Sequence, residues 1–404
     1  MSRALARSQR PSPVAVPAPL PYGMHVVDED DIAAVVAALR SNLLAQGPRV
    51  AAFEDAFAET IGAVDAVACS CGTAALHLAL AGLDVGPGDT CIVPAITFVA
   101  TATAARFLDA EVVFCDVDPE SGLATPATVE RAVERAGSVK AVLPVHLAGR
   151  VCDVPGIVAA APGAAIVEDS CHALGSIDRL GLHVGACTDA AAATFSFHPV
   201  KTIASGEGGM VAVQDRALAK RLRRLRNHGV TREAQEMTLG ASFSAPGRPN
   251  PWSYEQLELG FNYRMNEMEA ALGLSQLGKL NAFVTRRRAL SARYDRLLAP
   301  LVRTTTVPAG QTPAPHLYTV LIDFPAAGME RADVMRALAD KGVGTQVHYI
   351  PVYRQPYFRD RYGDMRLPGA EAYYARVLSL PLFPAMADED VERVVEALVE
   401  VLWG

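Results

Sequence analysis

The sequence lacks an excess of basic residues. Lys and Arg number 37 against 44 Asp and Glu, which gives a formal net charge of −7 and a pI near 5.8. Proteins that bind nucleic acid present a basic patch or stripe, so this balance argues against a nucleic-acid partner. No window approaches the roughly 18 consecutive apolar residues that a membrane-spanning helix requires, so we expect no membrane partner either.

Paired cysteines are also missing. The seven cysteines are odd in number, include no CxxC pair and lie mostly in apolar segments. This pattern is typical of reduced, buried thiols in a cytoplasmic protein rather than of a disulfide framework or a zinc site. The histidines show no HExxH or other ligand spacing, so we expect no metal.

The first 21 residues lack the apolar stretch and the small-residue cleavage site of a signal peptide. They carry three arginines and then become Pro-rich, and we interpret residues 1–21 as a flexible lead-in. The rest of the chain is long enough for one large domain and a smaller one. We expect the large domain over 22–284 and a smaller C-terminal α+β domain over 285–404.

Short apolar runs alternate with helical periodicity from about residue 30. Such alternation predicts βα units and a largely parallel sheet with helices on both faces. The strand candidates are 66–69, 91–94, 112–115, 141–145, 165–168, 192–197, 210–213 and 318–323. The clearest helix candidates are 31–44, 50–61, 73–83, 265–298 in one or two pieces, 331–341 and 389–402.

Two ionisable residues follow strand candidates. Asp169 ends the run AAIVED, and a carboxylate at the end of a parallel strand lies where open α/β sheets bind ligands. An aspartate that merely caps a turn is an equally good interpretation of this residue alone. Lys201 leaves an apolar strand and enters a Gly-rich turn. A partly desolvated lysine becomes an amine nucleophile for Schiff-base chemistry, although a surface lysine is the commoner case.

Two further elements complete a pattern. The pattern around Ser70–Leu76 predicts a short strand, a small-residue turn and a helix. The free N–H groups at the start of such a helix suit a phosphate, although a plain helix cap has the same sequence pattern. Phe98 follows a buried strand, where it either packs in the core or stacks on a flat ring. A phosphate cradle, a stacking aromatic, an acid for a pyridinium nitrogen and a Schiff-base lysine are the contacts that pyridoxal phosphate (PLP) needs.

From about Tyr22 to its end the chain carries a set of longer motifs in a fixed order. They are QGP at 46–48, CGTAALHLAL at 71–80, GPGD at 86–89, PAITFVAT at 94–101, EDSCHALGS at 168–176, SFHPVK at 196–201, GEGG at 206–209, GFNYRMNEMEAALGLSQL at 260–277 and VHYIPVYRQPYF at 347–358. With these motifs the chain resembles the sugar aminotransferases of the DegT/DnrJ/EryC1/StrS family. The resemblance implies the fold type I PLP architecture, a large α/β domain with a mostly parallel seven-stranded sheet.

The resemblance also implies roles for individual residues. Lys201 matches the Schiff-base lysine that serves as general acid and base, and Asp169 matches the acid that keeps the pyridine nitrogen protonated. Asn262 matches a phosphate contact that comes from the neighbouring subunit, which implies a homodimer with shared active sites, and Arg264 is a second choice for that contact. The cofactor contacts implied are Gly72, Thr73, Ala74, Phe98, Asp169, His172, Ser196, Lys201, Asn262 and Arg264.

Within the family, the chain is most similar to the subgroup that aminates C4 of UDP-linked 4-keto-6-deoxy-N-acetylhexosamines, including the pseudaminic acid pathway enzymes. L-Glutamate is the implied amino donor. The implied substrate contacts are Tyr22, Leu44, Ala45, Gln46, Gly47, His348, Tyr349, Ile350 and Pro351. Two departures bear on the identity of the sugar: Ala45 stands where members often have Thr, and Cys71 stands where Ser or Asn is usual.

Other functions remain open. The acceptor is alternatively a dTDP- or GDP-linked keto-sugar or an aminocyclitol ketone. The family's sugar dehydratases resemble the chain but carry histidine in place of the lysine, so Lys201 argues against them. A PLP-fold protein without catalysis predicts the loss of Lys201 or Asp169, or an added DNA-binding module, and the sequence has neither feature.

Overall fold

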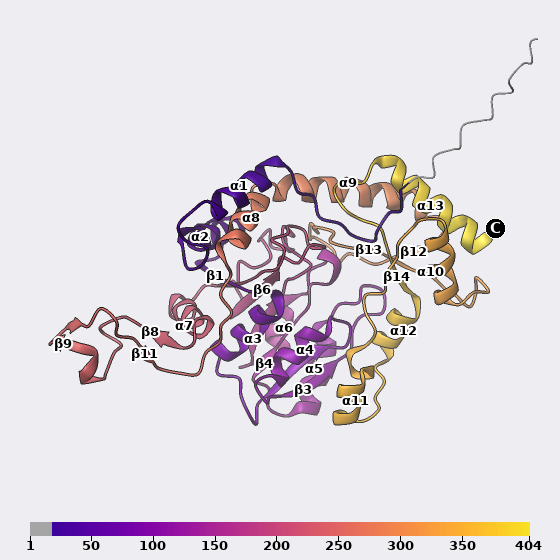
Figure 1. Cartoon of the computed structure of the whole chain (residues 1–404). Coiled ribbons are helices and arrows are strands. Elements are labelled where there is room, and N and C mark those ends of the chain that lie inside the picture. Colours follow the sequence, from indigo (N-terminus) through magenta and orange to yellow (C-terminus); the bar gives the residue numbers. More distant parts are fainter. Residues whose placement is uncertain (1–17) are drawn as a thin grey trace, which may run out of the picture.

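The computed structural model describes residues 18–404, so most of the expected lead-in, residues 1–17, lies outside the described residues. A seven-stranded sheet in the order β1-β7-β6-β5-β4-β2-β3 forms the centre (Figure 1). Strand β7 runs antiparallel to both neighbours and the other pairs are parallel, which confirms the mostly parallel seven-stranded sheet. The strands are β1 (Asp65–Cys69), β2 (Thr90–Pro94), β3 (Glu111–Cys115), β4 (Ala141–Val142), β5 (Ala165–Asp169), β6 (Ala192–Ser196) and β7 (Gly209–Val213).

Helices link and cover these strands. They are α1 (Glu29–Leu39), α2 (Pro48–Ile61), α3 (Gly72–Gly82), α4 (Val99–Arg106), α5 (Pro126–Ala136), α6 (Val154–Ala160), α7 (Arg216–Arg226), α8 (Glu267–Leu277) and α9 (Leu280–Leu298). Helix α1 ends five residues before the expected position, because the Ser41 hydroxyl donates to the Ala38 carbonyl and terminates the last turn. Strand β4 is shorter than expected because Pro144 has no N–H for a ladder hydrogen bond.

The C-terminal region has its own antiparallel sheet in the order β12-β13-β14. Its elements are β12 (Arg303–Thr304), β13 (Tyr318–Leu321), α10 (Arg331–Asp340), α11 (Pro356–Tyr362), α12 (Pro368–Arg376), β14 (Val377–Leu380) and α13 (Asp388–Trp403). A segment with the short strands β8 (Val230–Thr231), β9 (Phe243–Ala245), β10 (Arg248–Pro249) and β11 (Glu255–Gln256) extends away from the central sheet (Figure 1).

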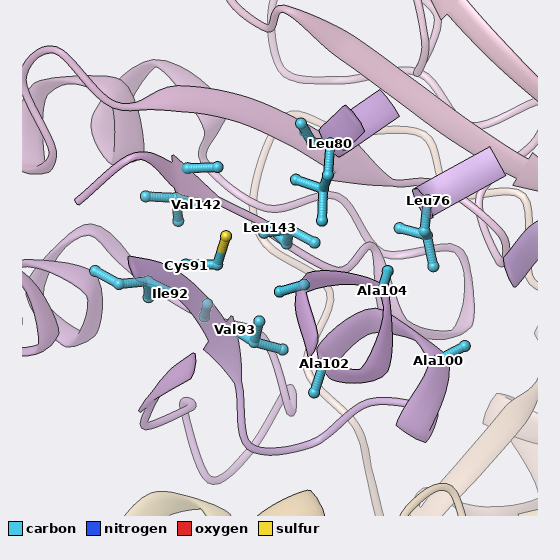
Figure 2. Packing of buried hydrophobic residues seen from close by; sticks show 14 of the residues in the cluster. Leu76, Leu80, Cys91, Ile92, Val93, Ala100, Ala102, Ala104, Val142 and Leu143 are labelled. Atoms are coloured by element: carbon cyan, nitrogen blue, oxygen red, sulfur yellow. The ribbon is translucent and has the colours of Figure 1, made fainter. Parts of the chain in front are cut away.

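Helix α3 packs directly on the central sheet. Leu76 and Leu80 from α3 lie close to Cys91, Val142 and Leu143 in and beside the strands (Figure 2). All five side chains are at most 2% exposed. Burying a Leu or Val side chain contributes roughly 1.5–3 kcal/mol, so this contact fixes the start of α3 relative to the strand ends. The position of that helix start matters for the site described below.

The two expected domains are joined by segments that pack in both of their hydrophobic cores. The expected boundary at residue 285 falls inside α9, where Val284 packs in a large-domain cluster and Leu290 in the C-terminal cluster. The stretch 352–377, expected in the small domain, contributes side chains to the large-domain core. Leu20 is paired with Val343 and buried in the C-terminal cluster, so the lead-in ends before residue 21.

Across the described residues, 18–404, the helices are too short or too polar for any of them to cross a lipid bilayer.

Candidate active site

A cavity of about 890 Å³ opens at the carboxyl edge of the central sheet. Residues that follow β1, β2, β5 and β6 line it, together with the C-terminal segment 346–350. The carboxyl ends of parallel strands meet at this edge, which is where open α/β sheets bind ligands. The cavity lining includes Gly72, Thr73, Phe98, Asp169, His172, Ser196 and Lys201, so these seven residues from four sequence motifs come together.

The first turn of α3 faces the cavity at Gly72 and Thr73. A Cβ atom on Gly72 would lie 2.7 Å from Cβ of Ser196, so only glycine allows the helix start to approach β6 this closely. The Sγ of Cys71 caps the helix and accepts the N–H of Ala74 at 3.4 Å. Ala74 itself is buried beneath the cavity and does not line it. The helix N-terminus and the Ser196 hydroxyl form a cradle for a phosphate.

Asp169 lies at the end of β5 and is 6% exposed. Its Oδ2 accepts a hydrogen bond of 2.7 Å from the hydroxyl of Thr101, and its Oδ1 accepts the N–H of Cys171 at 3.2 Å. The Thr101 hydroxyl is also 2.7 Å from that of Thr97, one turn earlier. The carboxylate is therefore held in one orientation at the wall of the cavity.

Lys201 lies in the turn after β6, where its backbone N–H donates to the His198 carbonyl at 2.8 Å. Burial lowers the pKa of its amine, and the nearby Cys171 and Asp169 only partly oppose this effect. Within residues 18–404 no carboxylate is near enough to form an ion pair with it. A lysine with a lowered pKa has a larger neutral fraction, which makes it a better nucleophile and base.

His172 is held by two hydrogen bonds. Its Nδ1 accepts the N–H of Ala148 at 3.4 Å, and its Nε2 lies 3.2 Å from the hydroxyl of Tyr349. Because Nδ1 accepts, Nε2 carries the proton and donates to Tyr349. Burial and the nearby charge of Lys201 lower the pKa of His172 well below its usual range, and burial lowers that of His348 to about 3. These histidines are neutral in the folded protein.

The remaining predicted residues fall into two groups. The cavity is lined by Tyr22, His348, Tyr349 and Ile350. Phe98 also lines it, and 56% of its surface is exposed. Outside the cavity lie Leu44, Ala45, Gln46, Gly47, Asn262, Arg264 and Pro351.

The 44–47 turn is held at the start of α8, where the carboxylate of Glu267 accepts the N–H of Gly47 at 3.1 Å. Arg264 donates to the side chain of Asn227 at 2.7 Å, and Asn262 pairs with Asn227. In the single chain, then, neither the turn nor the Asn262 segment reaches the cavity.

Two residues with clear positions in the site escaped the sequence analysis. Thr101 binds Asp169, and Glu267 fixes the 44–47 turn. The position of Thr97 and Thr101 just after a buried strand is a signal for the first, because side chains that follow a parallel strand lie at the edge where open α/β sheets bind ligands. No local signal marks the second, because Glu267 lies 220 residues from Gly47.

The residues present fit PLP. Its phosphate suits the N-terminus of α3 beside Ser196. Because Gly72 has no side chain, the start of this helix can lie close to Ser196. Its ring nitrogen suits the oriented carboxylate of Asp169, and its aldehyde suits the amine of Lys201, which has no ion-pair partner in the part of the chain that the structure describes. Phe98 offers an exposed aromatic face at the same cavity.

The chain is similar to known proteins over nearly its whole length. Residues 25–399 match the DegT/DnrJ/EryC1/StrS aminotransferase family. The chain is 37% identical over 392 residues to the spore coat polysaccharide biosynthesis protein SpsC of Bacillus subtilis (strain 168), covering 95% of this chain and 97% of SpsC.

Two solved structures are also similar. PseC of Helicobacter pylori, an aminotransferase involved in the biosynthesis of pseudoaminic acid, aligns with a TM-score of 0.82 and 27% identity, covering 95% of this chain and 99% of PseC. The PLP form of Spr1654 from Streptococcus pneumoniae aligns with a TM-score of 0.84 and 27% identity, covering 95% and 98%. The chain therefore belongs to the DegT/DnrJ/EryC1/StrS aminotransferase family, which confirms the resemblance seen in its sequence, and it is a PLP-dependent aminotransferase of fold type I.

Proposed function

We propose that this aminotransferase moves an amino group from L-glutamate to the C4 ketone of a UDP-linked 4-keto-6-deoxy-N-acetylhexosamine. The observation that carries the proposal is the single cavity that joins the cofactor residues to Tyr22, His348 and Ile350 from both ends of the chain. At about 890 Å³ it is near the upper end of the range for small-molecule sites, so it has room for a sugar beside a cofactor.

Bound PLP supplies an electron sink for the bonds that change at the amino-bearing carbon. The chain supplies binding, orientation and proton transfer. Lys201 takes and returns the proton, because its lowered pKa leaves a larger fraction of the amine neutral and able to act as a base. Asp169 holds the ring nitrogen through a carboxylate that Thr101 and the N–H of Cys171 keep in place. The neutral His172 holds the Tyr349 hydroxyl at the cavity without adding a second positive charge beside Lys201.

The proposal includes a homodimer with shared active sites. Asn262, Arg264 and the 44–47 turn lie outside the cavity of their own chain, as expected for residues that serve the site of a second copy. The segment that leads to Asn262 exposes large apolar side chains that a partner would cover, namely Leu239 (60%), Trp252 (74%), Tyr254 (59%), Leu257 (41%) and Leu259 (86%). We place the enzyme in the cytoplasm, where seven unpaired cysteines stay reduced.

PseC supports an N-acetylhexosamine acceptor, because its described role lies in the biosynthesis of pseudoaminic acid. The SpsC description, spore coat polysaccharide biosynthesis, is compatible with this acceptor and equally with a dTDP-linked keto-sugar. Ala45 is the residue of the chain that most favours the second candidate, because it removes a hydroxyl from the turn that we assign to substrate binding.

A panel of acceptors tests the proposal. The holoenzyme is supplied with L-glutamate and, one at a time, UDP-4-keto-6-deoxy-L-AltNAc, its D-gluco epimer, a dTDP-4-keto-6-deoxy sugar and scyllo-inosose, and release of 2-oxoglutarate is measured. We expect turnover with a UDP-sugar and none with the inosose. Turnover with the dTDP-sugar or the inosose alone would show that our acceptor is wrong, although the enzyme would still be an aminotransferase. A parallel reaction with L-glutamine in place of L-glutamate tests the identity of the donor.

A further inference from the structure

A second cavity of about 270 Å³ lies between the two halves of the chain, away from the cofactor site. Its walls come from the turn around Ala148, from the middle of α9 and from β12–β13. It shares no lining residue with the active-site cavity. One water needs roughly 10–15 Å³ measured in this way, so the space is large enough for a small molecule.

Arg150 is the main charged group in its wall and is only 4% exposed. One Nη donates to the hydroxyls of Thr305 and Thr319 at 2.7 and 3.2 Å, and the other donates to the Ser121 carbonyl at 2.9 Å. Its Nε has no partner among the described residues. Tyr373 also lies beside it, but burial raises the pKa of that phenol, which therefore stays neutral. The guanidinium is thus buried among neutral oxygens.

Arg288 adds a second guanidinium to the same wall. It donates to the carbonyls of Pro313 at 2.7 Å and of Thr312 and Gly175 at 3.3 Å, and no carboxylate within residues 18–404 pairs with it. Burial lowers the pKa of both arginines, which is the signature of cations that lack a nearby negative charge.

Two other polar groups line the cavity. The hydroxyl of Ser291 is buried and finds no partner in the described chain. Asp295 is the carboxylate in the lining, and its Oδ1 accepts the hydroxyl of Tyr318 at 2.7 Å. Two cations against one carboxylate leave the cavity with a net positive charge and an unused hydroxyl donor.

We propose that this cavity binds a small oxyanion, a carboxylate or a phosphate, between Arg150, Arg288 and Ser291. A buried cation is costly unless a negative charge compensates it, and the acceptors of Arg150 among the described residues are neutral. A guanidinium donates in a planar fork that matches carboxylate and phosphate oxygens. The Ser291 hydroxyl supplies a third donor. Neither the reaction nor the cofactor site uses these residues.

Calorimetric titration of the PLP-loaded enzyme tests the site, because bound cofactor already fills the phosphate cradle of the active site. Sodium phosphate and sodium acetate are titrated separately at constant ionic strength, with sodium chloride as the reference. We expect saturable binding of at least one oxyanion beyond chloride, and the one that binds more tightly identifies the ligand class. Heats equal to those of chloride for both salts would overturn the proposal.

Variants locate the binding. Arg288→Gln should weaken binding about tenfold and Ser291→Ala should weaken it several-fold, because each removes one donor to the anion. Arg286→Gln is the matched control, since it removes a charge from the same helix but pairs with Asp388 outside the cavity, and it should leave the affinity unchanged. Equal affinity in Arg288→Gln and the parent enzyme would place the anion elsewhere and refute the site.

Discussion

The hydroxyl of Thr101 donates a 2.7 Å hydrogen bond to Oδ2 of Asp169, across 68 residues of sequence. Thr101 lies on α4 after β2, and Asp169 ends β5, so the bond joins two strand ends at one edge of the sheet. Together with the N–H of Cys171 it uses one acceptor position on each carboxylate oxygen and leaves the others for a ligand. Thr101 therefore positions the group that we assign to the ring nitrogen of the cofactor.

Replacing Thr101 with valine should lower kcat/KM about 10- to 100-fold, because a hydrogen bond to a charged group contributes roughly 1.5–3 kcal/mol and the carboxylate loses its orientation. The visible spectrum of the bound cofactor should shift as well, which a merely structural residue would not cause. Thr103→Val is the control on the same helix, since that hydroxyl donates to the Val99 carbonyl. A Thr101→Val enzyme within twofold of the parent would contradict the assigned role.

Replacing Lys201 with alanine should abolish turnover and, in the same variant, remove the visible absorption of the lysine-linked cofactor. Both effects follow because one amine serves as attachment point and proton carrier. Lys220→Ala, an exposed lysine that pairs with Glu233, is the control. Retained turnover in Lys201→Ala would rule out the assignment, and a normal circular dichroism spectrum would show that the fold is intact.

Replacing Gly72 with alanine should weaken cofactor binding at least tenfold, because the added Cβ would lie 2.7 Å from Cβ of Ser196 and push the helix start away from β6. Fluorescence titration of the apo-enzyme with PLP measures the change. Gly86→Ala is a matched control, since no atom of residues 18–404 lies within 4 Å of its new Cβ and its backbone needs no positive φ. Unchanged affinity in Gly72→Ala would show that the cradle tolerates the displacement.

Replacing Glu267 with glutamine should loosen the 44–47 turn. Its fully buried carboxylate accepts the N–H groups of Gly47 and Arg49 at 3.1 and 3.0 Å at the start of α2, and an amide both loses the charge and turns a donor toward those groups. We expect a lower melting temperature and, if the turn reaches the substrate of a second copy, a several-fold higher KM for the keto-sugar.

Glu269→Gln serves as its control, because Glu269 caps only its own helix. If the Glu267→Gln variant has a changed melting temperature but an unchanged KM, then Glu267 has a structural role and the 44–47 turn does not contact the substrate.

Acid should destabilise the protein, and His77 is one of the buried histidines that contribute to this effect. Burial lowers the pKa of His77 to about 4, against a usual value of 6.5, so between these values the unfolded chain binds a proton that the folded chain does not. The stabilisation is fully present above pH 6.5 and is lost as the pH falls toward 4. At pH 5 the loss from this residue is about 2 kcal/mol relative to pH 7.5.

Urea unfolding of the parent and of His77→Gln at pH 5 and 7.5 measures this effect. The variant should lose less stability on acidification than the parent, whereas His25→Gln, which changes an exposed histidine, should behave like the parent. Identical pH dependence in the parent and His77→Gln would show that the histidine does not contribute.

The sequence by itself determined the elements and the chemistry. Alternating apolar runs and helical periodicity placed all seven strands of the central sheet within a few residues, because these patterns are local. It also predicted that Gly72, Asp169 and Lys201 serve one site, because PLP needs a phosphate cradle, an acid and a Schiff-base lysine together. That combination of groups indicated PLP, and the family motifs assigned the role of each residue.

Only the tertiary structure decided how these elements meet. The strand order β1-β7-β6-β5-β4-β2-β3 brings Gly72 against Ser196 and Thr101 against Asp169, and no local pattern encodes that order. It also decided that α9 spans both cores, that Leu20 joins the C-terminal cluster and that Arg150 is buried with no carboxylate partner within residues 18–404. The physical reason is that periodicity reports which face of an element is buried, whereas the choice of neighbour depends on packing between segments far apart in the chain.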